Sequence, residues 1–173
     1  MADPINPDLL DFDIISDESE LSIIDVEEED ELDTLGVRNF LTTLALVYKK
    51  NYLTSIWKVS YEKETIAFFT ISMNSVGLPI IPTEKQISEM KGRYPAILLG
   101  QMWVNKKFRG RHVSYWISQY VKGLARRISP SIACSCIVLQ TDKDERKIRA
   151  YRRANFVPSK ESDGKIWMYQ STF

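Results

Sequence analysis

Apolar residues in the first half of the chain follow two different spacings, which predict a helix and then a pair of strands. From residue 32 to Asn51 the apolar side chains recur at helical spacing, which predicts a helix or a helical pair that ends at Asn51. Residues 55–62 and 65–73 are rich in aromatic and β-branched residues and flank a short charged turn, which is typical of a β-hairpin. After a loop with Gly and Pro, we expect a short helix over residues 84–91.

The second half of the chain begins with residues 96–104, an almost unbroken apolar run of strand length. Such a run predicts a central strand that is covered on both faces, and its Gly100 indicates a bulge or a close backbone approach. A basic turn follows, and from Val113 to Ile128 the apolar residues recur at helical spacing. The remaining elements are a second buried-type strand (131–141), a helix from about Asp144 to Ala154 and a hairpin around Gly164.

This order of elements predicts an α/β fold, with a mixed central sheet of about six to seven strands and helices on both of its faces. A chain of 173 residues with 44% hydrophobic residues is expected to form one ordinary core. Residues 1–34 are acidic and include only a short apolar patch at 21–26, so we expect a mobile tail that contributes one edge strand. We place an acidic, flexible segment at residues 1–28 and the folded domain at residues 29–173.

The zero net charge conceals an uneven distribution. Residues 1–35 carry fourteen acidic side chains and no Lys or Arg, whereas residues 36–173 carry 23 basic and nine acidic side chains. A basic body of this kind is typical of proteins that bind nucleic acid or phosphate-rich small molecules. Alternatively, the acidic segment only neutralises the body and improves solubility. A third hypothesis is that this segment folds back on the basic surface as a mimic of nucleic acid, so that its deletion tightens nucleic-acid binding.

Several classes of protein are excluded by composition. No stretch has the ~20 uninterrupted apolar residues of a membrane helix, and the N-terminus lacks the basic and then apolar order of a secretory signal. We therefore expect a cytoplasmic protein with no membrane partner. Cys134 and Cys136 are too close for an ordinary disulfide, and with His112 as the one histidine they make a poor zinc site. We expect two small apolar core residues and no metal.

The strand, turn and helix over residues 102–117 have the outline of a phosphate site. Backbone N–H groups of a turn that enters a helix converge on one point, where the positive end of the helix dipole adds to them. Side chains that can add charge or a hydroxyl group are Lys106, Lys107, Arg109, Arg111 and Ser114. On the other hand, any strand followed by a helix needs a turn, and basic residues at a helix start are tolerated in solvent.

The turn resembles the signature of the GNAT superfamily of acetyltransferases: Arg or Gln, two residues, Gly, one residue, then Gly or Ala, straight after a central strand. Arg109 matches the first position, while His112 stands in place of Gly and Ser114 in place of Gly or Ala. The resemblance implies a GNAT fold and acetyl-CoA as cosubstrate. The coenzyme-binding residues that it implies are Met102, Trp103, Val104, Arg109, Gly110, Arg111, His112, Val113, Ser114 and Asp144.

Residues 143–156 resemble the last helix of the same superfamily, which commonly ends in Phe-Tyr, three residues and Gly-Phe. Tyr151 aligns with that Tyr, and Asn155 replaces the Gly that follows the helix. This exchange is conservative, because Asn is the next best residue after Gly in the left-handed conformation. Asp144 stands where the superfamily often has Asn, at a plausible N-cap.

Shorter features resemble one subgroup, the tRNA-acetylating toxin-type GNATs. They are Tyr94-Pro95, Leu99-Gly100, residues 69–72, the acidic lead-in near Asp30 and the Lys-Asp-Glu opening of the last helix. The resemblance covers roughly residues 28–172. It implies an enzyme that acetylates a primary amine, the α-amine of aminoacyl-tRNA, and an antitoxin-like protein partner. The sequence leaves a homodimer open.

In an enzyme of this kind the amine attacks the thioester directly. Strand N–H groups near residues 100–103 polarise the acetyl carbonyl, and Tyr151 is the implied general acid that protonates the departing thiolate. Without the resemblance, Tyr151 is interpreted as a core residue, because Ile148, Tyr151 and Ala154 share one helical face. No general base is identified. The alternative function is a catalytically degenerate GNAT-fold module that binds nucleic acid or a protein partner.

Overall fold

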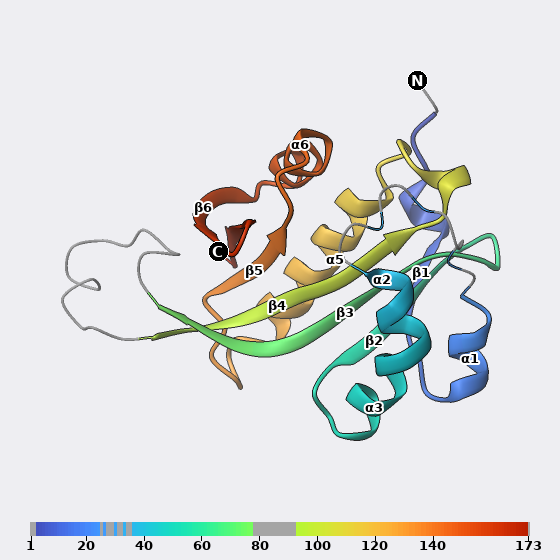
Figure 1. Cartoon of the computed structure of the whole chain (residues 1–173), viewed down its shortest axis with the longest axis horizontal. Coiled ribbons are helices and arrows are strands. Elements are labelled where there is room, and N and C mark those ends of the chain that lie inside the picture. The colour runs from blue at the N-terminus through green and yellow to red at the C-terminus, as the bar shows by residue number, and fades with distance from the viewer. Residues whose placement is uncertain are drawn as a thin grey trace. The chain divides into compact units, whose positions relative to one another are not determined.

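The structure is a computed structural model that describes residues 3–24, 26, 30, 33, 36–77 and 93–172. The short helix predicted over residues 84–91 lies outside these ranges. The helical elements are η1 (Pro7–Leu9), α1 (Glu18–Ser22), α2 (Val37–Asn39), η2 (Phe40–Leu44), α3 (Ala45–Lys50), η3 (Lys106–Phe108), α5 (Val113–Ile128) and α6 (Glu145–Arg153) (Figure 1). The strands are β1 (Leu10–Ile14), β2 (Ser55–Tyr61), β3 (Glu64–Gly77), β4 (Arg93–Val104), β5 (Cys136–Thr141), β6 (Val157–Ser162) and β7 (Lys165–Ser171).

The described strands form one sheet in the order β1-β2-β3-β4-β5-β7-β6. The pairs β1–β2, β2–β3, β5–β7 and β6–β7 are antiparallel, whereas β4 and β5 are parallel. The β4–β5 ladder joins residues 96–98 to residues 136–138. The predicted mixed α/β sheet is confirmed, and its described part contains seven strands.

The chain divides into two compact units, which are described separately. The first unit comprises Met1–Ser72 and Gly100–Trp116, and the second comprises Met73–Leu99 and Ile117–Phe173. Strands β3 and β4 and helix α5 therefore each contribute residues to both units.

In the first unit, the helical region at residues 37–50 begins with a cap. Gly36 has a left-handed φ of 71°, and the carboxylate of Asp33 accepts hydrogen bonds from the N–H groups of Val37 and Arg38. The middle of the region, η2, is a π-helix. The region ends at Asn51, whose Nδ2 donates to the Val47 carbonyl at 2.8 Å. The predicted helical region and its end are confirmed, but the described helix begins only at Val37, after the non-helical Gly36.

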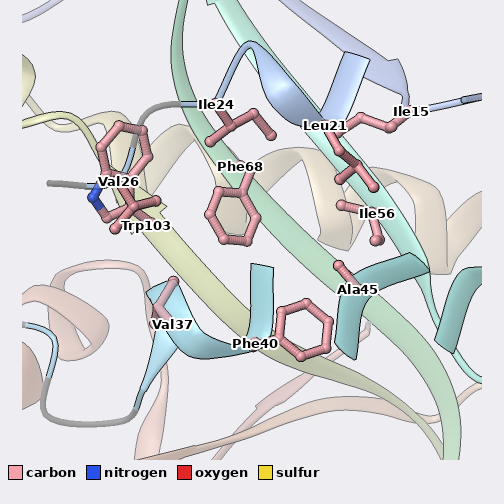
Figure 2. Close-up of a cluster of buried hydrophobic side chains, with 10 residues drawn as sticks. All are labelled: Ile15, Leu21, Ile24, Val26, Val37, Phe40, Ala45, Ile56, Phe68 and Trp103. Atoms are coloured by element: carbon pink, nitrogen blue, oxygen red, sulfur yellow. The ribbon is translucent and has the colours of Figure 1, made fainter. Parts of the chain in front are cut away.

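The core of this unit gathers side chains from its helices and strands (Figure 2). Trp103 of β4 stacks on Phe68 of β3 with ring centroids 6.2 Å apart. Three members, Leu21, Ile24 and Val26, come from the apolar patch of the acidic N-terminal segment. The full cluster is Ile15, Leu21, Ile24, Val26, Val37, Phe40, Ala45, Ile56, Phe68 and Trp103. The expected edge strand exists, but it is β1; the apolar patch instead overlaps α1 and supplies core residues.

The predicted hairpin at residues 55–73 is also confirmed. Tyr61 pairs with Glu64 across a two-residue turn, and Glu62 and Lys63 have φ of 49° and 72°. Two left-handed residues define a turn of type I′, whose twist matches that of the flanking strands.

In the second unit, β7 lies between β5 and β6. Its Gln170 donates from Nε2 to the carbonyl of Ala154 at 2.8 Å, which ties β7 to the end of α6. The hairpin that joins β6 to β7 turns at Asp163 and Gly164, with φ of 53° and 74°. The predicted helix near residues 144–154 and the final hairpin are therefore confirmed.

Both cysteines of this unit are free thiols in buried positions, as expected. Burial raises the pKa of the Cys136 thiol to about 11, so this group stays protonated near neutral pH. Cys136 packs with Val76, Ala96 and Val138 in a second core cluster. In the described part of the chain, no helix is long and apolar enough to cross a membrane.

Candidate functional site

The phosphate turn, residues 104–114, has a backbone that the sequence shapes closely. Asn105 opens it by accepting a hydrogen bond from the Lys107 N–H at 3.0 Å, which starts the 3-10 turn η3. Arg109 is extended, and then Gly110 and His112 take left-handed φ values of 78° and 67°. His112 therefore adopts the conformation that the superfamily signature assigns to glycine. Helix α5 begins at the next residue.

This backbone leaves donors at the start of a long helix. Among the described residues, no group accepts a hydrogen bond from the N–H of Gly110, His112 or Val113. The positive end of the α5 dipole lies at the same point. N–H groups in this arrangement are suited to oxygen atoms of a phosphate or pyrophosphate. Lys106 and Lys107 are exposed beside them, and Ser114 is half-buried.

The Arg109 side chain is occupied within the protein. Its Nε donates to the carbonyl of Val104 at 2.9 Å, and its two terminal nitrogens donate to the two carboxylate oxygens of Asp30, with Nη1–Oδ1 at 2.9 Å. The Asp30 side chain is only 2% exposed. In this structure the guanidinium group therefore closes the turn internally, and its predicted contact with the coenzyme stays a prediction.

Arg111, between the two left-handed residues, is also held. Its guanidinium carbon lies 5.4 Å from the centre of the Phe108 ring and 5.9 Å from that of Tyr61. Its Nε donates to the carbonyl of Asp3 at 3.0 Å, while its own carbonyl accepts from the N–H of Ile5 at 3.1 Å. The outer side of the turn is thus covered by residues 3–5.

The coenzyme-binding residues predicted at the end of β4, 102–104, alternate between half-buried and buried side chains. Trp103 is buried in the core, whereas Met102 and Val104 are half-buried. Successive side chains of a strand point to opposite faces. Met102 and Val104 therefore lie on one face of β4, and Trp103 lies on the other. For Trp103, the predicted coenzyme contact is therefore limited to its backbone.

Two residues before Met102, the strand makes the close approach that Gly100 predicts. A Cβ atom added to Gly100 would lie 2.6 Å from Oγ1 of Thr70. The same hydroxyl accepts a hydrogen bond from the N–H of Gln101 at 2.9 Å. The Gln101 N–H of β4 therefore donates its hydrogen bond to a side chain of β3 and not to a backbone carbonyl.

Tyr151, the predicted general acid, belongs to the second unit. The residue is half-buried on α6, and its ring meets that of Phe156 edge to face at 5.9 Å. Burial raises the pKa of the phenol, and the carboxylate of Asp142 raises it further. Within the described ranges its hydroxyl makes no hydrogen bond. The phenol is thus kept in its protonated form with its proton uncommitted.

Asp144 caps the helix that carries Tyr151. Its carboxylate accepts from the Arg146 N–H at 2.7 Å and from the Arg146 guanidinium, and these bonds lower its pKa to about 2. The predicted N-cap is confirmed. Its contact with the coenzyme stays a prediction, because the observed bonds of its carboxylate are all to Arg146 of its own helix.

Sequence reasoning missed the partners that hold these side chains. Asp30 and Thr70 contact Arg109 and Gln101 from distant parts of the chain, and Asp142 lies near Tyr151 with a 2.8 Å ion pair to Lys147. No periodicity marks any of the three. As for metals, the described residues contain no group of three His, Cys, Asp or Glu that is able to hold one.

Comparisons by sequence and by structure give different results. No protein-family model and no curated protein matches the chain by sequence. Solved structures do match: AtaT complexed with acetyl-methionyl-tRNAfMet has a TM-score of 0.74 at 15% identity, over 94% of this chain and 95% of that one. A tyrosine-to-phenylalanine mutant of KacT has a TM-score of 0.75 at 13% identity, over 95% of both chains. AtaTR bound with AcCoA has a TM-score of 0.71 at 15% identity, again over 95% of both.

These likenesses define the class of fold. The protein has the GNAT fold that AtaT and KacT share, and the expected fold class is confirmed. The structures that it is similar to include the AtaT toxin bound to the C-terminus of the antitoxin AtaR, and KacT.

Proposed function

We propose that this chain is an N-acetyltransferase that transfers an acetyl group from acetyl-CoA to a primary amine, the α-amine of aminoacyl-tRNA. The observation that carries the proposal is the phosphate turn: left-handed Gly110 and His112 leave N–H donors at the start of α5, on a GNAT fold. The similar structures include AtaT with an acetylated methionyl-tRNA and AtaTR with acetyl-CoA. The excess of basic residues in positions 36–173 fits a polyanionic acceptor.

The residues that would hold the coenzyme are those of the turn. Free N–H groups at Gly110, His112 and Val113 suit its pyrophosphate, and Lys106 and Lys107 add positive charge for a further phosphate. Acetyl-CoA would supply the acetyl group as a thioester. Backbone donors of β4 near residues 100–103 would polarise the carbonyl of that group.

Tyr151 would supply the proton for the leaving group. The neutral amine attacks the acetyl carbon, the carbon–sulfur bond breaks, and the phenol donates its proton to the thiolate sulfur as the amine loses one to solvent. A phenol with a raised pKa stays protonated near neutral pH, where part of the amine is already neutral. No general base is assigned; an α-amine on an ester has a pKa near or below about 7.7 and is partly neutral without one.

A catalytically degenerate module that binds nucleic acid is the second candidate. It is favoured by the ion pair between Arg109 and Asp30, which occupies one of the two arginines of the turn and withdraws it from any phosphate. An antitoxin-like protein is a partner in both cases, by similarity to AtaT with AtaR.

Calorimetric titration of acetyl-CoA into the full chain tests the coenzyme site first. Micromolar affinity supports the enzyme. Absence of binding, together with tRNA binding that weakens steeply between roughly 50 and 200 mM salt, supports the degenerate module.

Transfer of labelled acetyl from acetyl-CoA tests the acceptor. Aminoacyl-tRNA should become labelled, whereas uncharged tRNA and aminoacyl-tRNA with a blocked α-amine should not. Tyr151→Phe should lower kcat by about 10²-fold or more while leaving acetyl-CoA affinity unchanged. Tyr52→Phe is the matched control, since Tyr52 is 96% exposed. Equal rates for wild type and Tyr151→Phe would remove the general-acid assignment.

A further inference from the structure

The acidic N-terminal segment, residues 1–35, meets the phosphate turn at two places. Asp30 binds Arg109 with both carboxylate oxygens, and residues 3–5 bind the backbone and side chain of Arg111. These are the two arginines of the turn, and each is adjacent to a left-handed residue. The segment therefore contacts the part of the turn whose backbone conformation is least favoured for an ordinary residue.

Asp30 holds Arg109 in a defined geometry. A buried carboxylate is stable only when its lone pairs are satisfied. Two parallel hydrogen bonds from one guanidinium group also fix the orientation of the guanidinium plane relative to the carboxylate plane. The third bond of the same guanidinium, to the Val104 carbonyl, ties residue 109 back to the end of β4. Asp30 thus fixes the loop from residue 104 to residue 109, and with it the position of the backbone that enters Gly110.

Residues 3–5 brace the next step of the turn. Ile5 is 2% exposed, and its N–H reaches the Arg111 carbonyl, which lies between the left-handed Gly110 and His112. The aromatic rings of Tyr61 and Phe108 lie under the Arg111 guanidinium. The N-terminal segment and the first hairpin together restrain Arg111, whose neighbours offer the free N–H groups.

We propose that Asp30 is a positioning residue for the phosphate turn, and that the acidic N-terminal segment organises this turn instead of blocking it. The inference rests on the proposed coenzyme site. Simple electrostatics and a positioning role predict opposite changes in the affinity for acetyl-CoA. Removing a negative charge near a phosphate site should tighten binding, whereas removing a positioning group should weaken it. The inference also contradicts the hypothesis that the segment acts as a mimic of nucleic acid.

The test compares three variants of the full chain. Asp30→Asn keeps the shape and removes the charge, and Asp30→Glu keeps the charge and moves it by one methylene. Asp11→Asn is the control, because Asp11 is an exposed acid of the same segment on β1. Titration with acetyl-CoA should show affinity weakened about tenfold in both Asp30 variants and unchanged in the control. Under turnover, KM for acetyl-CoA should rise while kcat at saturation stays within about twofold.

Affinity that is unchanged or tighter in Asp30→Asn would overturn the proposal, and so would full affinity in Asp30→Glu, since that result would reduce the role to charge alone.

A second readout is independent of the coenzyme. Trypsin cleaves after arginine only where the backbone can open, so brief digestion with identification of the fragments reports on the turn. Cleavage after Arg109 and Arg111 should be slow in wild type and in Asp11→Asn, and about tenfold faster in both Asp30 variants. Equal cleavage in all four proteins would overturn the inference. If the turn opens as expected but wild type binds no acetyl-CoA, the proposed function fails and the positioning role stands.

Discussion

Oγ1 of Thr70 lies 2.6 Å from the place that a Cβ atom on Gly100 would occupy, and it accepts a hydrogen bond from the next residue's N–H. β3 and β4 are therefore joined at this point by a side chain that fits only beside a glycine. Gly100→Ala should force Thr70 aside and break its bond to Gln101, which should destabilise the protein by about 1–3 kcal/mol.

Urea unfolding of a double-mutant cycle checks this relationship. Thr70→Ala removes the clashing atom, so Gly100→Ala should cost much less in the Thr70→Ala background than in wild type. Additive free energies would show that the two residues do not act on each other.

The φ of 67° at His112 leads to a prediction about the turn itself. His112→Gly should keep the fold and bind acetyl-CoA at least as tightly as wild type, because glycine takes this conformation without cost. His112→Val should lower the melting temperature and weaken binding, since a β-branched residue is strained there. Thermal melting and calorimetric titration separate the two effects. Wild-type behaviour of the valine variant would contradict a left-handed residue 112.

Ionisation of the Tyr151 phenol should lower the free energy of unfolding at alkaline pH. Burial and the Asp142 carboxylate raise its folded-state pKa above the ordinary value of 10.0. The stability that this phenol contributes is complete below about pH 10 and is lost as the pH rises through its folded pKa, because the unfolded state releases the proton first. Unfolding in urea between about pH 9 and pH 12 should therefore show a shallower decline in Tyr151→Phe than in wild type. A Tyr52→Phe control should follow wild type.

Protonation of the Glu20 carboxylate should lower the free energy of unfolding at acid pH. This carboxylate accepts from the Lys58 ammonium at 2.6 Å and from the Ser16 N–H and hydroxyl at 2.6 and 2.7 Å. These bonds lower its pKa from 4.5 to about 2. A group with a lowered folded-state pKa contributes stability above its unfolded pKa, and this contribution is lost as the pH falls from 4.5 to about 2.

Acid titration of the free energy of unfolding tests this ion pair. Glu20→Gln should lose part of the decline across that range, whereas Glu18→Gln, an exposed neighbour in the same helix, should keep it. Identical acid curves for all three proteins would show that the Lys58 pair does not link proton binding to folding.

Local pattern was sufficient for most of the elements. Helical spacing located the region that ends at Asn51 and the helix that starts at Val113, because each depends on one apolar face and on a nearby cap. Left-handed Asn155 and Gly164 were also predictable, since few residues tolerate that conformation.

The partners of the site were not predictable, because they depend on contacts between distant residues. Asp30 is 79 residues from Arg109, and both belong to charge-rich stretches in which any of several pairs was equally plausible. The family signature predicted where the turn lies and which residues form it. It did not predict that the turn's first arginine faces a buried carboxylate, since a signature describes types of residue along the chain and not their neighbours in space.

The place of β7 in the sheet has a consequence for protein synthesis. β5 pairs with β4 on one side and with β7 on the other, yet α6 and β6 are translated before β7. Until residues 165–171 have left the ribosome, the apolar strand Cys136–Thr141 has one open edge, and β6 has no partner. An open apolar edge is a template for pairing with other chains. The nascent polypeptide therefore exposes an apolar strand edge to other chains until residues 165–171 emerge and pair with it.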